Sequence, residues 1–181
     1  MERSRAFEEL LLRLENKETI KHSLAVEAIM KKLAEHFNEE VRLWGIAGLV
    51  HDIDVERIQN DSRPHGMMGG DILECLDFDP TIVYAVRAHN PANNYERRRK
   101  IDKALYIASP MAEFIDACCK LFGENGLIKV TEEFIINKFN DKDFAPHISR
   151  ARIALCSELD LSLEDFVRLS LEAIREMSDL C

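Results

Sequence analysis

A histidine and an aspartate, His51 and Asp52, stand side by side at the end of an apolar run in the stretch LVHDIDVER, residues 49–57. In a helix, His51 shares the inward face of Trp44 and Ala47, which precede it by seven and four residues. An imidazole and a carboxylate in a core need polar partners, because an unpartnered buried polar group costs free energy. The chemistry of this pair therefore depends on where the other histidines fall.

Two further histidines fall on the apolar faces of separate predicted helices. His22 shares a stripe with Val26, four residues later, and His89 follows Val86 at a spacing of three. A hydrogen bond to a backbone carbonyl would satisfy any one of these rings. A divalent cation would satisfy all of them together, since imidazole nitrogen and carboxylate oxygen are ligands for Mn, Fe, Zn and Ni, and Mg also binds carboxylate-rich sites. The remaining histidines are interpreted separately: His65 at the start of a helix, and His36 and His147 as carbonyl-bonded or exposed.

The elements that must position these side chains are helices, and the predicted fold class is all-α. Strand signals are confined to TIVYAV, which directly follows a helix start, and to GLIKV, which is too short to build a sheet. We expect one compact domain over residues 1–181. The predicted helices cover about 7–14, 18–37, 41–48, 64–76, 80–90, 101–122, 131–139, 146–159 and 163–177.

Several residues predict where these helices begin, end or approach one another. Asn38 is expected to cap the helix near 41, and Asp79, followed by proline, the helix near 80. Pro110 should kink or divide the helix over 101–122. Gly45 and Gly48 each weaken a helix by roughly 1 kcal/mol relative to Ala. Two glycines near one face therefore predict that another backbone packs closely there.

Composition narrows the class of protein. The hydrophobic fraction of 46% is enough for a sizeable core, and the net charge of −9 argues against a partner such as a nucleic-acid polymer. No apolar run approaches the roughly 20 residues of a membrane span, and the N-terminal segment lacks a signal-peptide pattern, so we expect a cytoplasmic protein with no membrane partner. The oligomeric state stays open.

The number and spacing of the cysteines are also typical of a cytoplasmic protein. They are odd in number, without CxxC spacing, and this favours reduced thiols over a disulfide framework. The vicinal pair at 118 and 119 is either a soft-metal or redox site or two small buried hydrophobes. The five residues are Cys75, Cys118, Cys119, Cys156 and Cys181.

The order of the motifs is similar to that of a known family. The segments IKHSLAVEAIM, GLVHDID, RPHGMMGGDIL, AVRAHN and ALYIASPMAEFIDAC, in that order, resemble the HD-domain metal-dependent phosphohydrolase superfamily, above all its short prokaryotic HDIG-type proteins. An isolated His-Asp pair is a weak signal, whereas the ordered series is much stronger. The resemblance implies an HD-type helical core over about 17–122 and a C-terminal helical extension over about 123–181.

The resemblance also implies roles for individual residues. His22 would be the first metal ligand, and His51 and Asp52 the paired ligands. His65 and His89 would bind a second metal or contact the phosphate of the substrate. The metal is a divalent cation, and Mn, Fe, Ni, Zn, Co and Mg all remain open.

One position departs from the family pattern. The last metal ligand of the family is an Asp in a segment of the type ALYAADxLT, and here ALYIASPMA places Ser109 at that position. A neutral hydroxyl is a poor ligand, so the change would weaken the metal site or leave a water there. Glu113, one turn later, is a candidate replacement, and Asp102 and Asp116 share the face of Ser109 if the helix is continuous. Ser109 is alternatively an N-cap for a helix that restarts at the following proline.

Other polar residues near the motifs are candidates for catalysis or phosphate binding. Asp54 and Glu56 are candidates for a general acid or base, or are solvated loop carboxylates. Lys21, Arg63 and Arg87 are candidate phosphate-binding residues. The run RRRK at 97–100 is a solvated turn or part of an electrostatic funnel for an anion.

The function predicted from these features is hydrolysis of a small phosphorylated compound, plausibly a nucleotide. In this hypothesis the metal acidifies a bound water and polarises a phosphoryl oxygen, while His65 and His89 stabilise the developing charge. The alternative is a catalytically impaired HD domain that binds a nucleotide or metal as a regulatory module, and Ser109 is the residue that favours it. A plain helical interaction protein would require the order of the histidines to be accidental.

Overall fold

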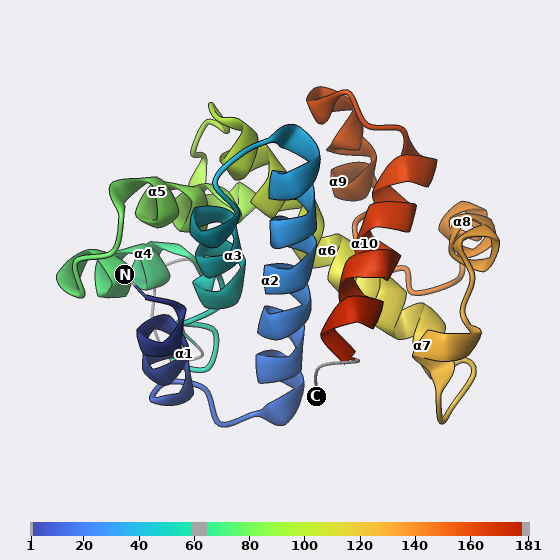
Figure 1. The fold of residues 1–181 in the computed structure, drawn as a ribbon, viewed down its shortest axis with the longest axis horizontal. Helices are drawn as coiled ribbons and strands as arrows, with labels where there is room; N and C mark the ends of the chain where they lie inside the picture. Colours follow the sequence, from blue (N-terminus) through green and yellow to red (C-terminus); the bar gives the residue numbers. More distant parts are fainter. Residues whose placement is uncertain (1, 59–64, 179–181) are drawn as a thin grey trace.

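The computed structural model describes residues 2–58 and 65–178, and within these ranges the regular structure is entirely helical (Figure 1). The all-α prediction is therefore confirmed. The α-helices are α1 (Arg3–Leu11), α2 (Lys17–Phe37), α3 (Val41–Val50), α4 (Met67–Cys75), α5 (Pro80–Ala88), α6 (Lys100–Lys120), α7 (Gly126–Lys129), α8 (Glu132–Asn140), α9 (Arg150–Ala154) and α10 (Leu163–Ser178), with short 3₁₀ helices η2 (Pro91–Asn93) and η3 (Leu155–Leu159).

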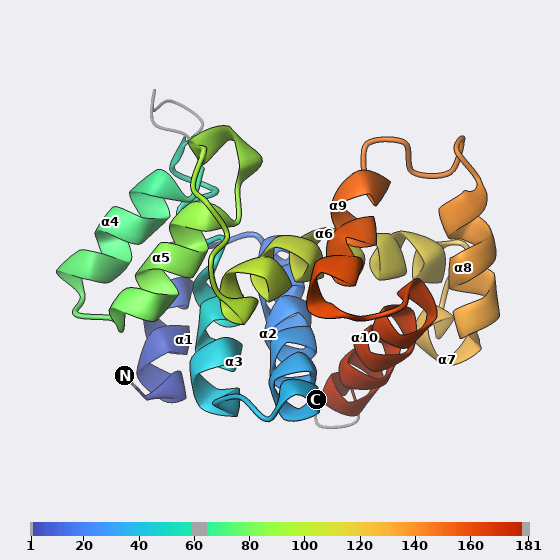
Figure 2. The same ribbon diagram turned by 90° about the horizontal axis from the view of Figure 1, so that it is seen from above.

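Two long helices, α2 and α6, organise the arrangement. Helix α2 packs against α3, α6 and α10, and α6 also contacts α5, α9 and η3. Helices α4 and α5 lie at one end of the molecule and α7 and α8 at the other, with α6 running between them (Figure 2). Within the described residues, no helix combines the length and the apolar character needed to cross a bilayer.

A single hydrophobic cluster joins the early and late parts of the chain. The stripe predicted on α2 is buried, with Val26, Ile29 and Leu33 fully inaccessible to solvent. The segment after residue 122 contributes Ile153 and Phe166 to the same cluster. The C-terminal helices therefore share their core with the helices that carry the histidines, although the boundary predicted near residue 122 stays a prediction.

Close packing of α3 on α2 depends on Gly48. A Cβ atom at this position would lie 2.8 Å from the carbonyl oxygen of Val26 and 2.9 Å from Cα of Glu27, both of which belong to the backbone of α2. At Gly45 the neighbouring atoms belong to the flexible side chain of Lys31. The predicted approach of a second backbone is thus confirmed at Gly48, and Gly45 faces a side chain instead.

Several helix boundaries differ from the prediction. Asn38 does not cap α3: it ends α2 in the left-handed conformation with φ 54°, and the carboxylate of Glu40 accepts the hydrogen bond from the Leu43 amide. The helix predicted from residue 64 begins at Met67, so His65 lies in the preceding turn. The helix predicted over 146–159 is two short pieces, α9 and η3. By contrast, the side chain of Asp79 caps α5 as expected.

Pro110 neither divides α6 nor starts a new helix, and Ser109 is an interior helical residue rather than an N-cap. A proline has no N–H to donate to the carbonyl four residues earlier, which here belongs to Tyr106. The guanidinium of Arg152 supplies the missing donor, with its Nη2 2.8 Å from that carbonyl oxygen. A contact from a distant helix therefore allows the helix to continue through the proline.

We expect Gly48→Ala to destabilise the protein, because the added methyl meets the backbone of α2. Overpacking costs about 1–3 kcal/mol, only partly offset by the roughly 1 kcal/mol gain in helix propensity. Thermal unfolding should show a Tm several degrees lower, since roughly 2–4 °C corresponds to each kcal/mol in a chain of this size. Gly45→Ala is the matched control and should leave Tm unchanged or raised. Equal Tm values for the two variants would contradict the close contact.

Candidate metal centre

Five side chains from four segments meet beside the N-terminal half of α2. His22 comes from α2 itself, and His51 is the C-cap of α3, with Asp52 next to it in the turn that follows. His65 precedes α4, and His89 is the C-cap of α5. The structure therefore brings together all the histidines that the sequence singled out, and they surround one carboxylate.

The carboxylate of Asp52 is the common neighbour. Its Oδ1 lies 2.9 Å from Nε2 of His65, 3.1 Å from Nε2 of His51 and 3.6 Å from Nε2 of His89. Its Oδ2 lies 3.7 Å from Nε2 of His22. Two overlapping groups result, His22 with His51 and Asp52, and Asp52 with His65 and His89; within each, the possible ligand atoms lie within 4.8 Å of one another.

The opposite nitrogen of three of these rings is held by a second layer of acceptors. A carbonyl oxygen only accepts hydrogen bonds, so the ring nitrogen that faces it must carry the proton. Metal-binding histidines are oriented in the same way, with the outer N–H donated to a carbonyl or carboxylate. The contacts of Nδ1 are 2.8 Å from His51 to the Gly48 carbonyl, 2.6 Å from His89 to the Val86 carbonyl and 2.7 Å from His65 to the Asp54 carboxylate.

This arrangement fits a cation. When Nδ1 of His51 carries the only ring proton and donates it to the Gly48 carbonyl, the lone pair of Nε2 faces the Asp52 carboxylate. Nε2 of His51 and Nε2 of His22 are both buried without a hydrogen-bond partner. Two lone pairs that face each other in a buried space repel, whereas a divalent cation between them would be bound by both. The donor set, imidazole nitrogens and one carboxylate, suits such an ion.

The surroundings shift the pKa values of these groups. Burial, aided by the neighbouring His51, lowers the pKa of His22 to about 4 and leaves its ring neutral. Burial opposes charge on His65 as well, but hydrogen bonds to Asp52 and Asp54 outweigh it and raise the pKa of His65 to about 10. A proton on Nε2 of His65 thus makes the favourable contact with Asp52 that a cation would make.

Asp54 contacts His65 and the start of α4. Its side chain is fully buried, and its Oδ2 accepts hydrogen bonds of 2.8 Å from the amides of Gly66 and Gly69 while Oδ1 lies 2.7 Å from Nδ1 of His65. These hydrogen bonds lower the pKa of Asp54 despite its burial. The contacts show that Asp54 orients His65, and the catalytic role stays a prediction. Glu56, the other candidate, accepts from the amides of Glu15 and Asn16.

The predicted phosphate-binding residues differ in their position relative to the cavity. Lys21 lines the cavity beside His22, and its Nζ lies 3.1 Å from Oδ1 of Asp116. Arg87 points instead toward α4, where it makes ion pairs with Asp71 and Glu74 and is not among the residues that line the cavity. Arg63 lies outside the described residues.

Among the residues that the structure describes, no carboxylate takes the place that the family pattern gives to Asp at position 109. Ser109 is nearly buried in α6, and Glu113, one turn later, lines the cavity without joining either ligand group. Burial and the negative charge of Asp52 raise the pKa of Glu113. Asp102 is bound by Arg99, and Asp116 is bound by lysines.

Arg152, from α9, is a site residue that the sequence reasoning missed. Its Nη2 donates to the backbone carbonyls of His89 at 3.1 Å and Tyr106 at 2.8 Å, and its guanidinium carbon lies 4.4 Å from the centre of the Tyr106 ring. Desolvation lowers the pKa of Arg152, opposed by Tyr106, Glu113 and Asp52. The one available signal was the proline in α6, which leaves a carbonyl in need of a donor.

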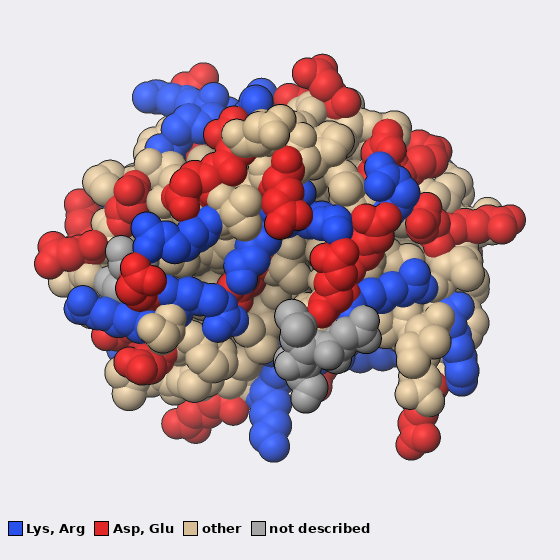
Figure 3. All heavy atoms as spheres, viewed as in Figure 1, with Lys and Arg blue, Asp and Glu red and all other residues tan. Residues whose placement is uncertain are grey.

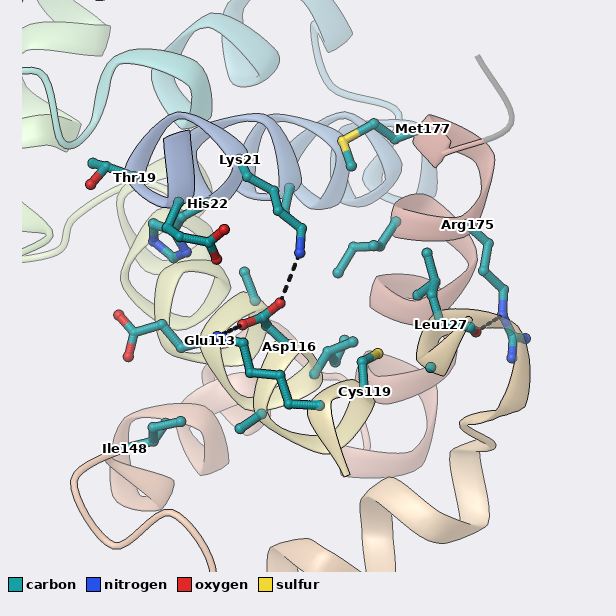
Figure 4. A pocket seen from close by; sticks show the side chains of 18 of the residues that line it. Thr19, Lys21, His22, Glu113, Asp116, Cys119, Leu127, Ile148, Arg175 and Met177 are labelled. Carbon is teal, nitrogen blue, oxygen red and sulfur yellow. Dashed lines mark hydrogen bonds and ion pairs between the residues drawn. The ribbon is translucent and has the colours of Figure 1, made fainter. Parts of the chain in front are cut away.

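A cavity of about 1250 Å³ opens beside the ligands (Figure 4). His22 and Asp52 lie in its wall together with Glu113 and His147, so a molecule in the cavity would reach the metal-binding atoms. The vicinal cysteines do not form a second metal site among the described residues: Cys118 is buried, and burial raises the pKa of its thiol to about 12.

Comparison with known proteins agrees with this geometry. A family model for the HD domain matches residues 19–117, more than half of the chain. The chain belongs to the HD-domain family. The match contains His22, His51, Asp52, His65 and His89, so the candidate metal centre lies within the HD domain, whereas Arg152 lies beyond it.

The curated relatives of this HD-domain protein resemble only part of it. Ribonuclease Y from three strains of Clostridium perfringens is 32% identical over 71 residues, which make up 39% of this chain. The matched region is 14% of the length of these relatives. No solved structure gives a significant match.

We expect Arg152→Met to destabilise the protein and weaken metal binding, because it removes the donor from two carbonyls, one of them that of His89. Each buried acceptor left unsatisfied costs about 1–3 kcal/mol. Pro110→Ala restores an N–H that can donate to Tyr106, so Arg152→Met should reduce Tm less in that background. Arg168→Met, on the exposed side of α10, is the control. If Arg152→Met lowers Tm by the same amount in the natural protein and in the Pro110→Ala background, the compensation between Arg152 and Pro110 is contradicted.

Proposed function

We propose that this protein is a metal-dependent phosphohydrolase that cleaves a small phosphorylated substrate. The observation that carries the proposal is the convergence of four imidazoles on the Asp52 carboxylate, with three of the rings oriented through Nδ1 by backbone or Asp54 acceptors. Membership of the HD-domain family supports the same reaction class.

His22, His51 and Asp52 would hold a first divalent cation, and Asp52 with His65 and His89 form the group that suits a second. A cation bound here would polarise a phosphoryl oxygen and acidify a nearby water, with Mn, Fe, Ni, Zn, Co and Mg as candidates. The chain's own contribution is to orient the ligands: carbonyl or carboxylate acceptors hold the rings of His51, His65 and His89 through Nδ1 before the substrate arrives. Glu113, whose pKa is raised, lies in the cavity wall as a group that can exchange a proton there.

A small molecule suits the chain better than a nucleic-acid polymer. A phosphate backbone is normally bound by clustered basic residues, whereas this chain has a net charge of −9. On the face seen in Figure 3, acidic and basic side chains are intermixed. The name of ribonuclease Y points to RNA, but the match covers only 14% of that relative's length and does not carry RNA cleavage over to this chain.

The second candidate function is a regulatory HD domain that binds a metal or nucleotide without turnover. Ser109 favours it, because the position that the family fills with Asp holds a neutral side chain inside α6. Turnover of a generic phosphoester with Mn²⁺, Ni²⁺, Co²⁺ or Mg²⁺ separates the two functions, since a module would bind metal and leave the ester intact.

We expect Asp52→Asn to lose metal and activity together. The substitution keeps the shape of the side chain but removes the negative charge shared by both ligand groups, and metal affinity should fall by at least about tenfold. Metal content per chain and hydrolysis of p-nitrophenyl phosphate are the measurements. His36→Gln, on the exposed part of α2, should retain both. Full metal content and turnover in Asp52→Asn would defeat the proposal.

We expect Ser109→Asp to bind metal more tightly than the natural protein, because it restores a carboxylate on the face of α6 that carries Glu113. Without metal, the buried charge should lower Tm, and saturating Mn²⁺ should then raise Tm more than in the natural protein. Ser157→Asp, at an exposed position in η3, controls for added surface charge. A natural protein that turns over p-nitrophenyl phosphate as fast as the variant argues for the enzyme, whereas turnover gained only in Ser109→Asp argues for the regulatory module.

A further inference from the structure

The cavity beside the metal centre is larger than a small phosphate ester requires. Its volume of about 1250 Å³ exceeds the roughly 300–1,000 Å³ of ordinary small-molecule sites. It extends from His22 on α2, along the C-terminal half of α6, to α7 and α10. A substrate with its phosphate at the ligands therefore leaves most of the cavity for the rest of the molecule.

The two ends of the cavity differ in polarity. The end at the ligands carries charged side chains, including Lys21 and Asp116. Beyond the Lys21–Asp116 ion pair, which crosses from α2 to α6 in Figure 4, the wall is mainly apolar. The apolar wall consists of Ala117, Cys119, Leu127, Ile128, Ile174 and Met177.

Ion pairs mark the boundary between the two ends. Asp116 accepts from Lys21 at 3.1 Å on Oδ1 and from Lys120 at 2.6 Å on Oδ2. Glu18 lines the same part of the cavity and interacts electrostatically with Lys120, so two carboxylates balance two ammonium groups there. The phosphate of a substrate held at His22 would lie on the ligand side of this group, and an uncharged chain would lie beyond it.

The apolar end does not suit a nucleobase. Among the described residues that line the cavity there is no Phe, Tyr or Trp, and the imidazoles of His22 and His147 belong to the end that carries Glu113 and the ligands, so the wall formed by α7 and α10 has no aromatic ring on which a base could stack. Arg175 is polar, but its guanidinium already donates to the carbonyls of Leu127 and Val130. Ile128 lines the same wall with 77% of its surface exposed, and an apolar group in the cavity would cover it.

We propose that the substrate is an amphiphilic phosphomonoester, with its phosphate at His22, His51 and Asp52 and an aliphatic chain along α6, α7 and α10. This inference rests on the proposed phosphohydrolase function and names its substrate class. The reaction consumes one water: the phosphorus–oxygen bond to the alcohol breaks, a new bond to the water oxygen forms, and the departing alkoxide takes up a proton.

The test compares n-butyl phosphate with n-octyl phosphate, each below its micelle concentration, with Mn²⁺ and the full chain. Each buried methylene contributes up to about fourfold in kcat/KM. We expect kcat/KM for the octyl ester to exceed that for the butyl ester by at least about tenfold, and adenosine 5′-monophosphate to be no better than the butyl ester.

Two variants connect that preference to the wall. Ile128→Asp and Met177→Asp place a charge at accessible wall positions and should reduce the octyl-to-butyl ratio at least about fivefold. Leu12→Asp is the matched control: Leu12 is 73% exposed and does not line the cavity, so the ratio should not change. Using two wall variants keeps the test decisive if one of them folds poorly.

The possible failures are distinct. If both esters are hydrolysed with similar kcat/KM, or if the wall variants keep the preference for octyl, the amphiphilic substrate is wrong and the phosphohydrolase stands. If neither ester nor p-nitrophenyl phosphate is hydrolysed with any of the metals, the proposed function itself is overturned, and the substrate class with it.

Discussion

The carboxylate of Asp52 is the group on which the rest of the site depends. Four imidazole nitrogens lie within 3.7 Å of its two oxygens, and two of the rings, His51 and His89, are buried. Such an arrangement is unfavourable for neutral rings and an anion alone, because their lone pairs face one another. A cation between these groups, or a proton on Nε2 of His65, turns the repulsion between the lone pairs into an attraction. The site is therefore built to hold positive charge at its centre.

Backbone packing sets the positions of the ligands. The absence of a side chain at Gly48 lets α3 approach α2, and the carbonyl of this same residue accepts the hydrogen bond from Nδ1 of His51. One glycine thus controls both the distance between His22 and His51 and the orientation of the second ring. On the opposite side, Arg152 ties the carbonyl of His89 to α6.

The segment beyond the HD match completes the structure around this centre. Residues 19–117 contain every predicted ligand, but Leu127, Ile174 and Met177, which form the apolar wall, lie after it. Arg152 also lies after it and makes the continuous helix through Pro110 possible. We therefore propose that the HD domain supplies the chemistry and that the C-terminal helices select the substrate. The two parts share one hydrophobic cluster, which fixes the position of the apolar wall relative to the ligands.

The sequence by itself determined the helical class and the cap at Asp79, because periodicity and capping are local properties, and its resemblance to HD domains singled out the five groups that converge. Only the tertiary structure decided what the other polar residues do. Asp54 and Glu56 have the same chemistry and stand two residues apart, yet one orients His65 and the other binds the amides before α2. Likewise, Arg87 pairs with α4, while Arg152, unremarkable in the sequence, reaches His89. A side chain's role here depends on which distant backbone lies beside it, and spacing along the chain does not contain that information.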